Sequence, residues 1–419
     1  MASKRTRKGN QKSRQYSRER SIIACCGLTL AMLVPIGAAH AGGFTVLYNF
    51  QGGRDGSMPE GTLIADSAGN LYGTTRTGGL NRCRDSGSRC GTVFKVAKNG
   101  TEKVLYRFLG REDGMQPIGG VIRDSSNNLY GTTTGGPFGQ GTNGSVFEIA
   151  ADRSEKTLFS FPGLPADPSD SLLLLNGVLY GTAETGGTGE NCTNGCGFLF
   201  KLTTAGAETA LHQFGNSNDG EFPAANVISD ASGNLYGTTF AGGANGFGTV
   251  FKVAANGTES VQYSFAGGND GLFPYGGLVA GASGDLYGTT EYGGGNGCDG
   301  GYGCGTVFKI APNGSETVLY QFAGGTDGAN PFAGLIRDKA GNLYGTTFAG
   351  GGNGCQFGEG CGTVFEITAG GQENILYTFS GNSDGANPYG GLLMKKGALY
   401  GTTTGGGSTG NGVVFKIEN

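Results

Sequence analysis

The 419-residue chain contains no tryptophan and only two histidines, and 15% of its residues are charged. His40 lies within the first 41 residues, so His212 is the only imidazole in the rest of the chain. This scarcity argues against a Ser-His-Asp triad and against a metal centre built on histidine. No 3.6-residue hydrophobic period is present after residue 41, so the sequence predicts strands rather than helices.

Glycine is abundant instead, at 87 residues, whereas proline numbers 12 and 37% of the residues are hydrophobic. A disordered glycine-rich chain would lack the regularly spaced Val, Leu, Tyr and Phe found here. Regular glycines among β-forming residues indicate many tight turns between short strands. Length alone does not distinguish one large closed domain from several smaller ones.

The first 41 residues have the pattern of an export signal. Eight basic residues precede an apolar run from Ile22 to Ala39, and Ala39-His40-Ala41 has the small–x–small pattern of a cleavage site. A retained membrane anchor is the alternative. Because Gly27, Pro35 and Gly37 interrupt the run, we expect cleavage and no stable membrane span afterwards.

Removal of this leader changes the charge of the protein. The whole chain carries a net charge of −4, and the leader holds eight basic residues and one acidic residue, so the remainder carries −11. An acidic surface argues against binding to nucleic-acid phosphates. We therefore expect a soluble exported monomer, secreted or periplasmic, that binds no nucleic acid.

The motif Leu-Tyr-Gly-Thr-Thr occurs six times, and once more with an altered end. Its tyrosines lie 50 to 58 residues apart, a period typical of propellers. Each period contains four short β-like runs, which in the unit 61–108 are 61–66, 70–75, 91–96 and 104–108. The sequence therefore predicts an all-β fold, a seven-bladed β-propeller of four-stranded antiparallel blades over residues 42–419. The motif copies begin at Leu71, Leu129, Leu179 (the altered copy), Leu235, Leu286, Leu343 and Leu399.

The order of strands at the two ends of this region predicts how the ring closes. Residues 44–50 match a fourth strand before any first strand has occurred, and residues 413–417 match a third strand. We expect residues 44–50 to pair with 413–417 and so complete the last blade, which removes two exposed strand edges. An open solenoid is the alternative, but it would have no use for this offset.

The repeated unit is Gly-Leu-Ile-x-Asp, a turn, Gly-Asn-Leu-Tyr-Gly-Thr-Thr, and then Gly-Thr-Val-Phe-Lys. It resembles the GloVer-type tandem repeat of exported bacterial proteins with varied C-terminal anchors, the choice-of-anchor group. The resemblance covers essentially all of residues 42–419, although no C-terminal anchor is visible. The first two strands also resemble NHL-type β-propeller repeats. This resemblance implies a propeller fold and an exported location, and it brings no catalytic residue with it.

The eight cysteines after the leader form four close pairs, each in the loop between a second and a third strand. Their even number, their spacing and the exported context predict local disulfides. A structural zinc site is the alternative, but it needs four ligands together and these pairs lie on different blades. The expected disulfides are Cys83–Cys90, Cys192–Cys196, Cys298–Cys304 and Cys355–Cys361.

The loops between blades carry a repeated Asp-Gly-x-x-Pro. A ring of carboxylates raises the hypothesis of calcium binding or acid–base chemistry. A residue that recurs from blade to blade is better explained by a structural role, in which each aspartate binds backbone N–H groups of its own turn. We expect no metal and no cofactor, with calcium as the weaker alternative. The aspartates are Asp55, Asp113, Asp219, Asp270, Asp327 and Asp384.

Two features of these loops are not shared by all blades. Tyr275, Phe332 and Tyr389 follow the loop proline on three consecutive blades, where they would stack on sugars or contact a partner if exposed, or pack between blades if buried. The third blade replaces the Asp-Gly turn with a segment that contains Asp167 and Asp170. We consider these five residues the candidate ligand-binding residues.

Two classes of function remain. The first is an exported, non-catalytic propeller whose loop face binds a glycan, a cell-envelope component or a protein partner. The second is a calcium-dependent hydrolase or lyase of the lactonase-like type, by analogy with other propellers. The second class requires non-repeated acidic residues clustered at the channel mouth, and none is evident in the sequence. We therefore expect the first class, with no catalytic residue.

Overall fold

The structure is a computed structural model. It describes residues 43–79, 90–110, 113–135, 143–162, 166–168, 170–189, 192–216, 218–295, 297–298, 301–352, 354–355 and 360–418. These ranges belong to the unit Ala39–Asn419, and the expected leader, residues 1–41, lies outside them. Within them, no helix has both the length and the hydrophobicity needed to cross a membrane.

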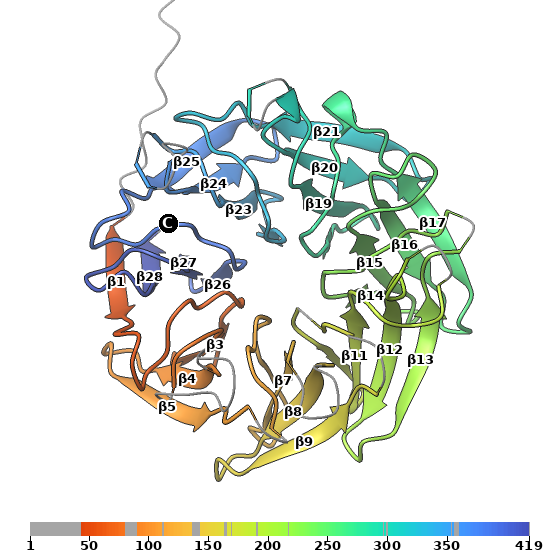
Figure 1. The fold of residues 1–419 in the computed structure, drawn as a ribbon. Helices are drawn as coiled ribbons and strands as arrows, with labels where there is room; N and C mark the ends of the chain where they lie inside the picture. Colours follow the sequence, from red (N-terminus) through yellow and green to blue (C-terminus); the bar gives the residue numbers. More distant parts are fainter. Residues whose placement is uncertain are drawn as a thin grey trace, which may run out of the picture. The chain divides into compact units, whose positions relative to one another are not determined.

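The described strands form seven four-stranded antiparallel sheets, which Figure 1 shows as blades arranged in a ring. The first strands of the blades are β2 (Ile64–Ala65), β6 (Ile122–Arg123), β10 (Leu173–Leu175), β14 (Ile228–Ser229), β18 (Val279–Ala280), β22 (Ile336–Arg337) and β26 (Leu393–Lys395). The second strands are β3 (Leu71–Thr75), β7 (Leu129–Thr133), β11 (Val178–Ala183), β15 (Leu235–Thr239), β19 (Leu286–Thr290), β23 (Leu343–Thr347) and β27 (Ala398–Thr403).

The outer half of each blade consists of a third and a fourth strand. The third strands are β4 (Thr92–Val96), β8 (Ser145–Ile149), β12 (Phe198–Thr203), β16 (Thr249–Val253), β20 (Thr306–Ile310), β24 (Thr363–Ile367) and β28 (Val413–Glu418). The fourth strands are β5 (Glu102–Arg107), β9 (Glu155–Ser160), β13 (Glu208–Gln213), β17 (Glu259–Ser264), β21 (Glu316–Gln321), β25 (Glu373–Thr378) and β1 (Phe44–Asn49). The one helical element in the described residues is the short 3₁₀ turn η1 (Gly268–Asp270).

The predicted closure of the ring is confirmed. Strand β1 pairs antiparallel with β28, with Phe44 opposite Ile417 and Asn49 opposite Val413. The seventh blade therefore has the order β1-β28-β27-β26 and joins the two ends of the propeller sequence without a covalent bond.

The first strands are shorter than the sequence suggested. Residues 61–66 were expected to form a strand, but only Ile64 and Ala65 do so. The preceding residues pack against the backbone of the next blade instead. A Cβ on Gly61 would lie 2.5 Å from the backbone nitrogen of Gly120. The glycines here allow the inner loops of neighbouring blades to approach closely, and this approach replaces strand pairing.

Each position of Leu-Tyr-Gly-Thr-Thr has a separate structural role. In the first blade, Leu71 is buried and the Tyr72 hydroxyl donates to Asp66 over 3.0 Å. A Cβ on Gly73 would lie 2.7 Å from the ring of Phe94, so only glycine leaves room for that ring. The Thr74 hydroxyl donates to the Gly119 carbonyl of the next blade over 2.8 Å. The motif thus specifies packing both within a blade and between blades.

The altered copy of the motif in the third blade lacks a pair of hydroxyl groups that five other blades have. In five blades the second threonine of the motif is within hydrogen-bonding distance of a hydroxyl at the start of the third strand, as for Thr75 and Thr92 at 2.8 Å. In the third blade these positions are Ala183 and Phe198, which face each other in the sheet. An apolar contact therefore replaces the hydroxyl pair.

Phenylalanine pairs hold neighbouring blades together. A buried ring just after each fourth strand meets the third-strand ring of the following blade edge to face or at a tilt, at centroid distances of 4.9–5.3 Å. Such geometry adds to the hydrophobic contribution of burying the rings. The pairs are Phe50–Phe94, Phe108–Phe147, Phe161–Phe200, Phe214–Phe251, Phe265–Phe308, Phe322–Phe365 and Phe379–Phe415.

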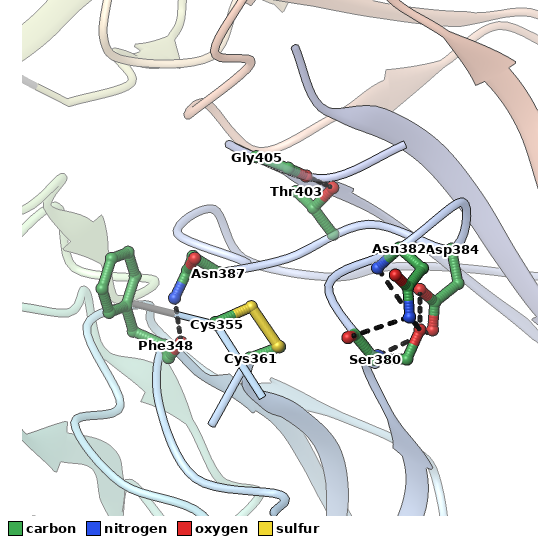
Figure 2. Close-up of a disulfide and its surroundings, with 9 residues drawn as sticks. All are labelled: Phe348, Cys355, Cys361, Ser380, Asn382, Asp384, Asn387, Thr403 and Gly405. Atoms are coloured by element: carbon green, nitrogen blue, oxygen red, sulfur yellow. Dashed lines mark hydrogen bonds between the residues drawn. A yellow bond between two sulfur atoms is a disulfide. The ribbon is translucent and has the colours of Figure 1, made fainter. Parts of the chain in front are cut away.

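The structural role predicted for the loop aspartates is confirmed. Asp384, for example, accepts from the backbone N–H of Ser380 over 2.8 Å (Figure 2). It also accepts from the Tyr377 hydroxyl over 3.0 Å. The other five aspartates make the same two kinds of contact. His212 stands in for the tyrosine at one of them, with its Nε2 2.9 Å from Asp219. The only imidazole after the leader therefore belongs to the scaffold.

Three of the four predicted disulfides are present, namely Cys192–Cys196, Cys298–Cys304 and Cys355–Cys361. Figure 2 shows the last of them beside the inner loop that carries Asn387. Cys90 is fully buried and disulfide-bonded. Its expected partner, Cys83, lies outside the described residues.

The close approach of glycine and phenylalanine gives a first prediction. A Cβ on Gly288 would lie 2.5 Å from the ring of Phe308. We expect Gly288→Ala to lower the free energy of unfolding by about 1–3 kcal/mol, because overpacking forces the ring out of its site. Urea unfolding measures the change. Gly53→Ala, where a Cβ meets nothing within 4 Å, is the control, and equal stability of the two variants would contradict the packing role.

A second prediction concerns pH. Burial raises the pKa of Glu102, Glu259, Glu316 and Glu373 to about 7, and the carboxylate of the nearest loop aspartate adds to the shift. Between the ordinary glutamate pKa and about 7, the folded protein binds more protons than the unfolded chain. Stability should therefore fall as the pH rises through this window. We expect the melting temperature to be lower at pH 8 than at pH 5.

Replacement of these four glutamates by glutamine should reduce that fall, because glutamine does not titrate. Scanning calorimetry of both proteins at pH 5, 6, 7 and 8 makes the comparison. The same decline in both proteins would show that other groups cause the pH dependence.

Candidate functional site

The loops between blades turn toward the propeller axis with an unusual backbone. In all seven blades the residue before the loop proline has a left-handed φ, between 37° and 60°. Asparagine tolerates this conformation well, and the sixth and seventh blades have Asn330 and Asn387 here. The Asn387 side chain also donates to the Phe348 carbonyl over 3.0 Å (Figure 2). Phe273, at φ 60°, is a bulky side chain in the same conformation and lacks the amide that makes this bond.

These loops surround a central cavity of about 290 Å³. Its lining comes from the inner loops of all seven blades, including the residue after the loop proline in six of them. These six residues differ in chemistry from blade to blade, in contrast to the repeated scaffold. They are Glu60, Ile118, Ala224, Tyr275, Phe332 and Tyr389.

One side of the cavity is aromatic. The rings of Phe332 and Tyr389 are stacked at 5.3 Å with 25° between their planes, and Tyr275 meets Phe332 edge to face at 5.9 Å. The phenols of Tyr275 and Tyr389 lie close enough for each to shift the pKa of the other. Burial is the main cause of the raised pKa of both phenols. The pKa of Tyr389 is raised to about 12, and the pKa of Tyr275 is raised further. The two phenols therefore stay neutral at physiological pH.

Further rings continue this aromatic side outward over the fourth and fifth blades. Phe240 stacks on Phe273 at 4.7 Å with 18° between the planes and meets Tyr275 at 5.9 Å. Phe273 meets Tyr292, which lies 6.3 Å from Tyr302, a residue that is 66% exposed. All these rings are at least partly exposed. We call this set the aromatic track: Tyr302, Tyr292, Phe273, Phe240, Tyr275, Phe332 and Tyr389.

The other side of the cavity is acidic. Asp170 accepts from the backbone N–H groups of Ser171 and Asn226, over 2.6 and 2.9 Å, and burial raises the pKa of its carboxyl. Burial likewise raises the pKa of Glu60, although Arg76, 3.3 Å away, opposes the shift. Glu184 is not part of the cavity lining, and burial and the charge of Asp167 raise its pKa.

The acidic and aromatic sides lie near each other. Burial is the largest cause of the raised pKa of both phenols. The carboxylates of Glu184 and Asp170 add to the shift of Tyr275. Those of Glu60, Asp170 and Glu184 add to the shift of Tyr389. A ligand in this cavity would therefore meet rings and carboxylates together.

Four of the five expected ligand-binding residues line this one cavity: Tyr275, Phe332, Tyr389 and Asp170. Asp167 does not line it. Asp167 instead accepts from the Thr185 hydroxyl over 3.2 Å, and burial raises its pKa. The sequence predictions did not include Glu60, Glu184 or Phe273. Comparison of the seven repeats could have found Glu60, which differs from its counterpart in every other blade. Glu184 and Phe273 recur as Glu291 and Phe222 and give no such signal.

Among the described residues, one group of three Cys, His, Asp or Glu side chains has its possible metal-ligand atoms within 4.8 Å of one another, namely Cys192, Cys196 and Glu221. The two sulfurs of this group are bonded to each other, so they offer no thiolate to a metal.

These features define a seven-bladed β-propeller with an asymmetric cavity on its axis. The chain belongs to the Gloeobacter/Verrucomicrobia repeat family, whose pattern matches residues 37–194, 139–357 and 298–419. The resemblance seen in the sequence is thereby confirmed. No curated protein matches the sequence.

Several solved structures share the fold. The extracellular domain of the hybrid two-component system BT4673 from B. thetaiotaomicron is 14% identical, with a TM-score of 0.54, over 88% of this chain and 39% of that one. A puromycin hydrolase mutant is 12% identical, with a TM-score of 0.52, over 83% of this chain and 50% of that one. This chain therefore spans half or less of each of these two proteins. At such identities the likeness shows the fold alone.

The left-handed loop position gives a third prediction. Gln116 has φ 57°, and asparagine in its place would relieve the strain as Asn330 and Asn387 do. We expect Gln116→Asn to raise the free energy of unfolding by about 1 kcal/mol. Phe273→Asn should raise it less, because that change also removes the stack on Phe240.

Urea unfolding of the two variants measures both effects, and the difference between them estimates what the Phe273 ring contributes to stability. Destabilisation by Gln116→Asn would show that the loop is not strained at this position.

Proposed function

We propose that this protein is an exported, non-catalytic propeller that binds a glycan at the mouth of its central cavity. The observation that carries the proposal is the aromatic track, because partly exposed rings on a rigid support suit the flat apolar faces of sugar rings. The scaffold does not require these rings. The blades that carry Glu60, Ile118 and Ala224 at the same loop position form equally regular sheets.

The size of the cavity supports a small ligand or one end of a chain. Its volume of about 290 Å³ lies at the lower end of the range for small-molecule sites, roughly 300–1,000 Å³. The track extends from this cavity to the exposed Tyr302, so a longer chain would have further rings to contact. An oligosaccharide whose terminal residue enters the cavity fits both features.

Export is part of the proposal. Three disulfides join residues only four or six positions apart in the sequence, and such bonds persist in oxidising compartments. The BT4673 domain, which has the same fold, is itself described as extracellular. Together with the leader predicted over residues 1–41, these observations support a secreted or periplasmic location.

A fourth prediction tests glycan binding. Screening on a glycan array followed by titration calorimetry should identify a bound oligosaccharide. We expect Phe332→Ala to weaken its binding roughly tenfold, which corresponds to about 1.4 kcal/mol for one stacked ring. Tyr302→Ala should weaken only the longer oligosaccharides, because Tyr302 lies at the far end of the track.

The control is Val261→Ala, which shortens an exposed hydrophobic side chain on the outer strand β17. It should leave binding unchanged. An array without hits, or undiminished affinity in Phe332→Ala, would rule out this function.

A further inference from the structure

The third blade departs from the repeat at the point where its inner loop reaches the cavity. Asp170 occupies the second position after the loop proline. The other six blades have glycine or alanine there, namely Gly61, Gly119, Ala225, Gly276, Ala333 and Gly390. The scaffold thus works with almost no side chain at this position, and the Asp170 carboxylate is an addition at the cavity wall.

A second acidic residue of the same blade lies nearby. Glu184 follows the altered motif at a position held by phenylalanine in the fourth and sixth blades, Phe240 and Phe348, and by glutamate, Glu291, in the fifth. The two carboxylates act on the same phenol, since both contribute to the raised pKa of Tyr275 after burial. The third blade therefore adds the negative charges of Asp170 and Glu184 close to the ring of Tyr275.

The described residues that line the cavity include no lysine, arginine or histidine. Glu60 has Arg76 as a partner, whereas the Asp170 carboxylate accepts from the backbone N–H groups of Ser171 and Asn226 and interacts with the Ser171 side chain, which are all uncharged groups. Burial without a cationic partner makes the charged form of a carboxylate unfavourable, and a positively charged ligand group would stabilise that form. The rings opposite them favour the same occupant, because a cation close to a tyrosine or phenylalanine face is attracted by the ring.

We propose that the ligand carries a protonated amino group, as in a sugar with a free amine, and that Asp170 binds this group beside the rings of Tyr275, Phe332 and Tyr389, with the nearby charge of Glu184 adding to the attraction. This inference rests on the proposed glycan binding and specifies the sugar class. A neutral sugar gains only the stacking and hydrogen bonds of the site. A uronic acid meets like charge.

Titration calorimetry at pH 6 with two matched oligosaccharides tests the inference. The first is the β-1,4-linked tetramer of N-acetylglucosamine, which is neutral, and the second is its fully deacetylated form, which carries amines. We expect the amine form to bind at least tenfold more tightly than the neutral form. The preference should weaken as the salt concentration rises, because the pairing is electrostatic.

Two variants assign the preference to the carboxylates. Asp170→Asn keeps an oxygen to accept from the backbone and removes the charge, and Glu184→Thr introduces the residue that the second and seventh blades have, Thr134 and Thr404. Each should reduce the preference for the amine form severalfold, measured as the ratio of the dissociation constants of the two tetramers. Phe332→Ala should weaken both tetramers. Melting temperatures close to that of the unmodified protein show that both carboxylate variants fold.

The possible results separate the two proposals. If the neutral tetramer binds as tightly as the amine form, or the glycan array gives hits only for neutral or acidic sugars, the inference about the amine is wrong and glycan binding stands. If no glycan binds, the proposed function fails and the inference fails with it. If both carboxylate variants prefer the amine tetramer over the neutral one as strongly as the unmodified protein does, these residues do not recognise the charge of the ligand.

Discussion

The contact between a phenylalanine that follows one blade and a phenylalanine in the next blade underlies the whole propeller. Both faces of a four-stranded blade carry hydrophobic side chains that must be buried, and the neighbouring blades are what bury them. The same pair occurs at all seven junctions, including Phe50 with Phe94, where the last blade meets the first. The glycine of Leu-Tyr-Gly-Thr-Thr is a consequence of this pair, because the second ring lies where its Cβ would be, as for Gly401 and Phe415.

The seven-fold repetition also explains how much the sequence could predict. Spacing and strand order predicted the blade count, the closure by β1 and β28, and the structural role of the loop aspartates. The short first strands were not predictable from β-propensity. The residues before them are held by contacts with another blade, as Gly61 is by Gly120, and such contacts are tertiary. The sequence predicts that the loops between blades meet on one face, but not the shape of the cavity, because seven loops that are distant in sequence form it.

The candidate site was visible in the sequence where it departed from the repeat. Tyr275, Phe332, Tyr389 and Asp170 were found because each breaks a recurring pattern. Glu184 and Phe273 carried no such signal, because the fifth blade repeats the glutamate as Glu291 and the fourth blade repeats the phenylalanine as Phe222. A phenylalanine looks unremarkable in a loop until the left-handed φ of 60° is known.

The pairing of β1 with β28 has a consequence for how the protein is made. Among the strands of the propeller, β1 is synthesised first and its partner β28 last. β1 therefore has no partner until the other strands of the propeller exist, and the seventh blade is the last to be completed. Pairing between such distant segments is also slow, because a long loop must close first. Closure of the ring is thus the latest step that the order of synthesis allows.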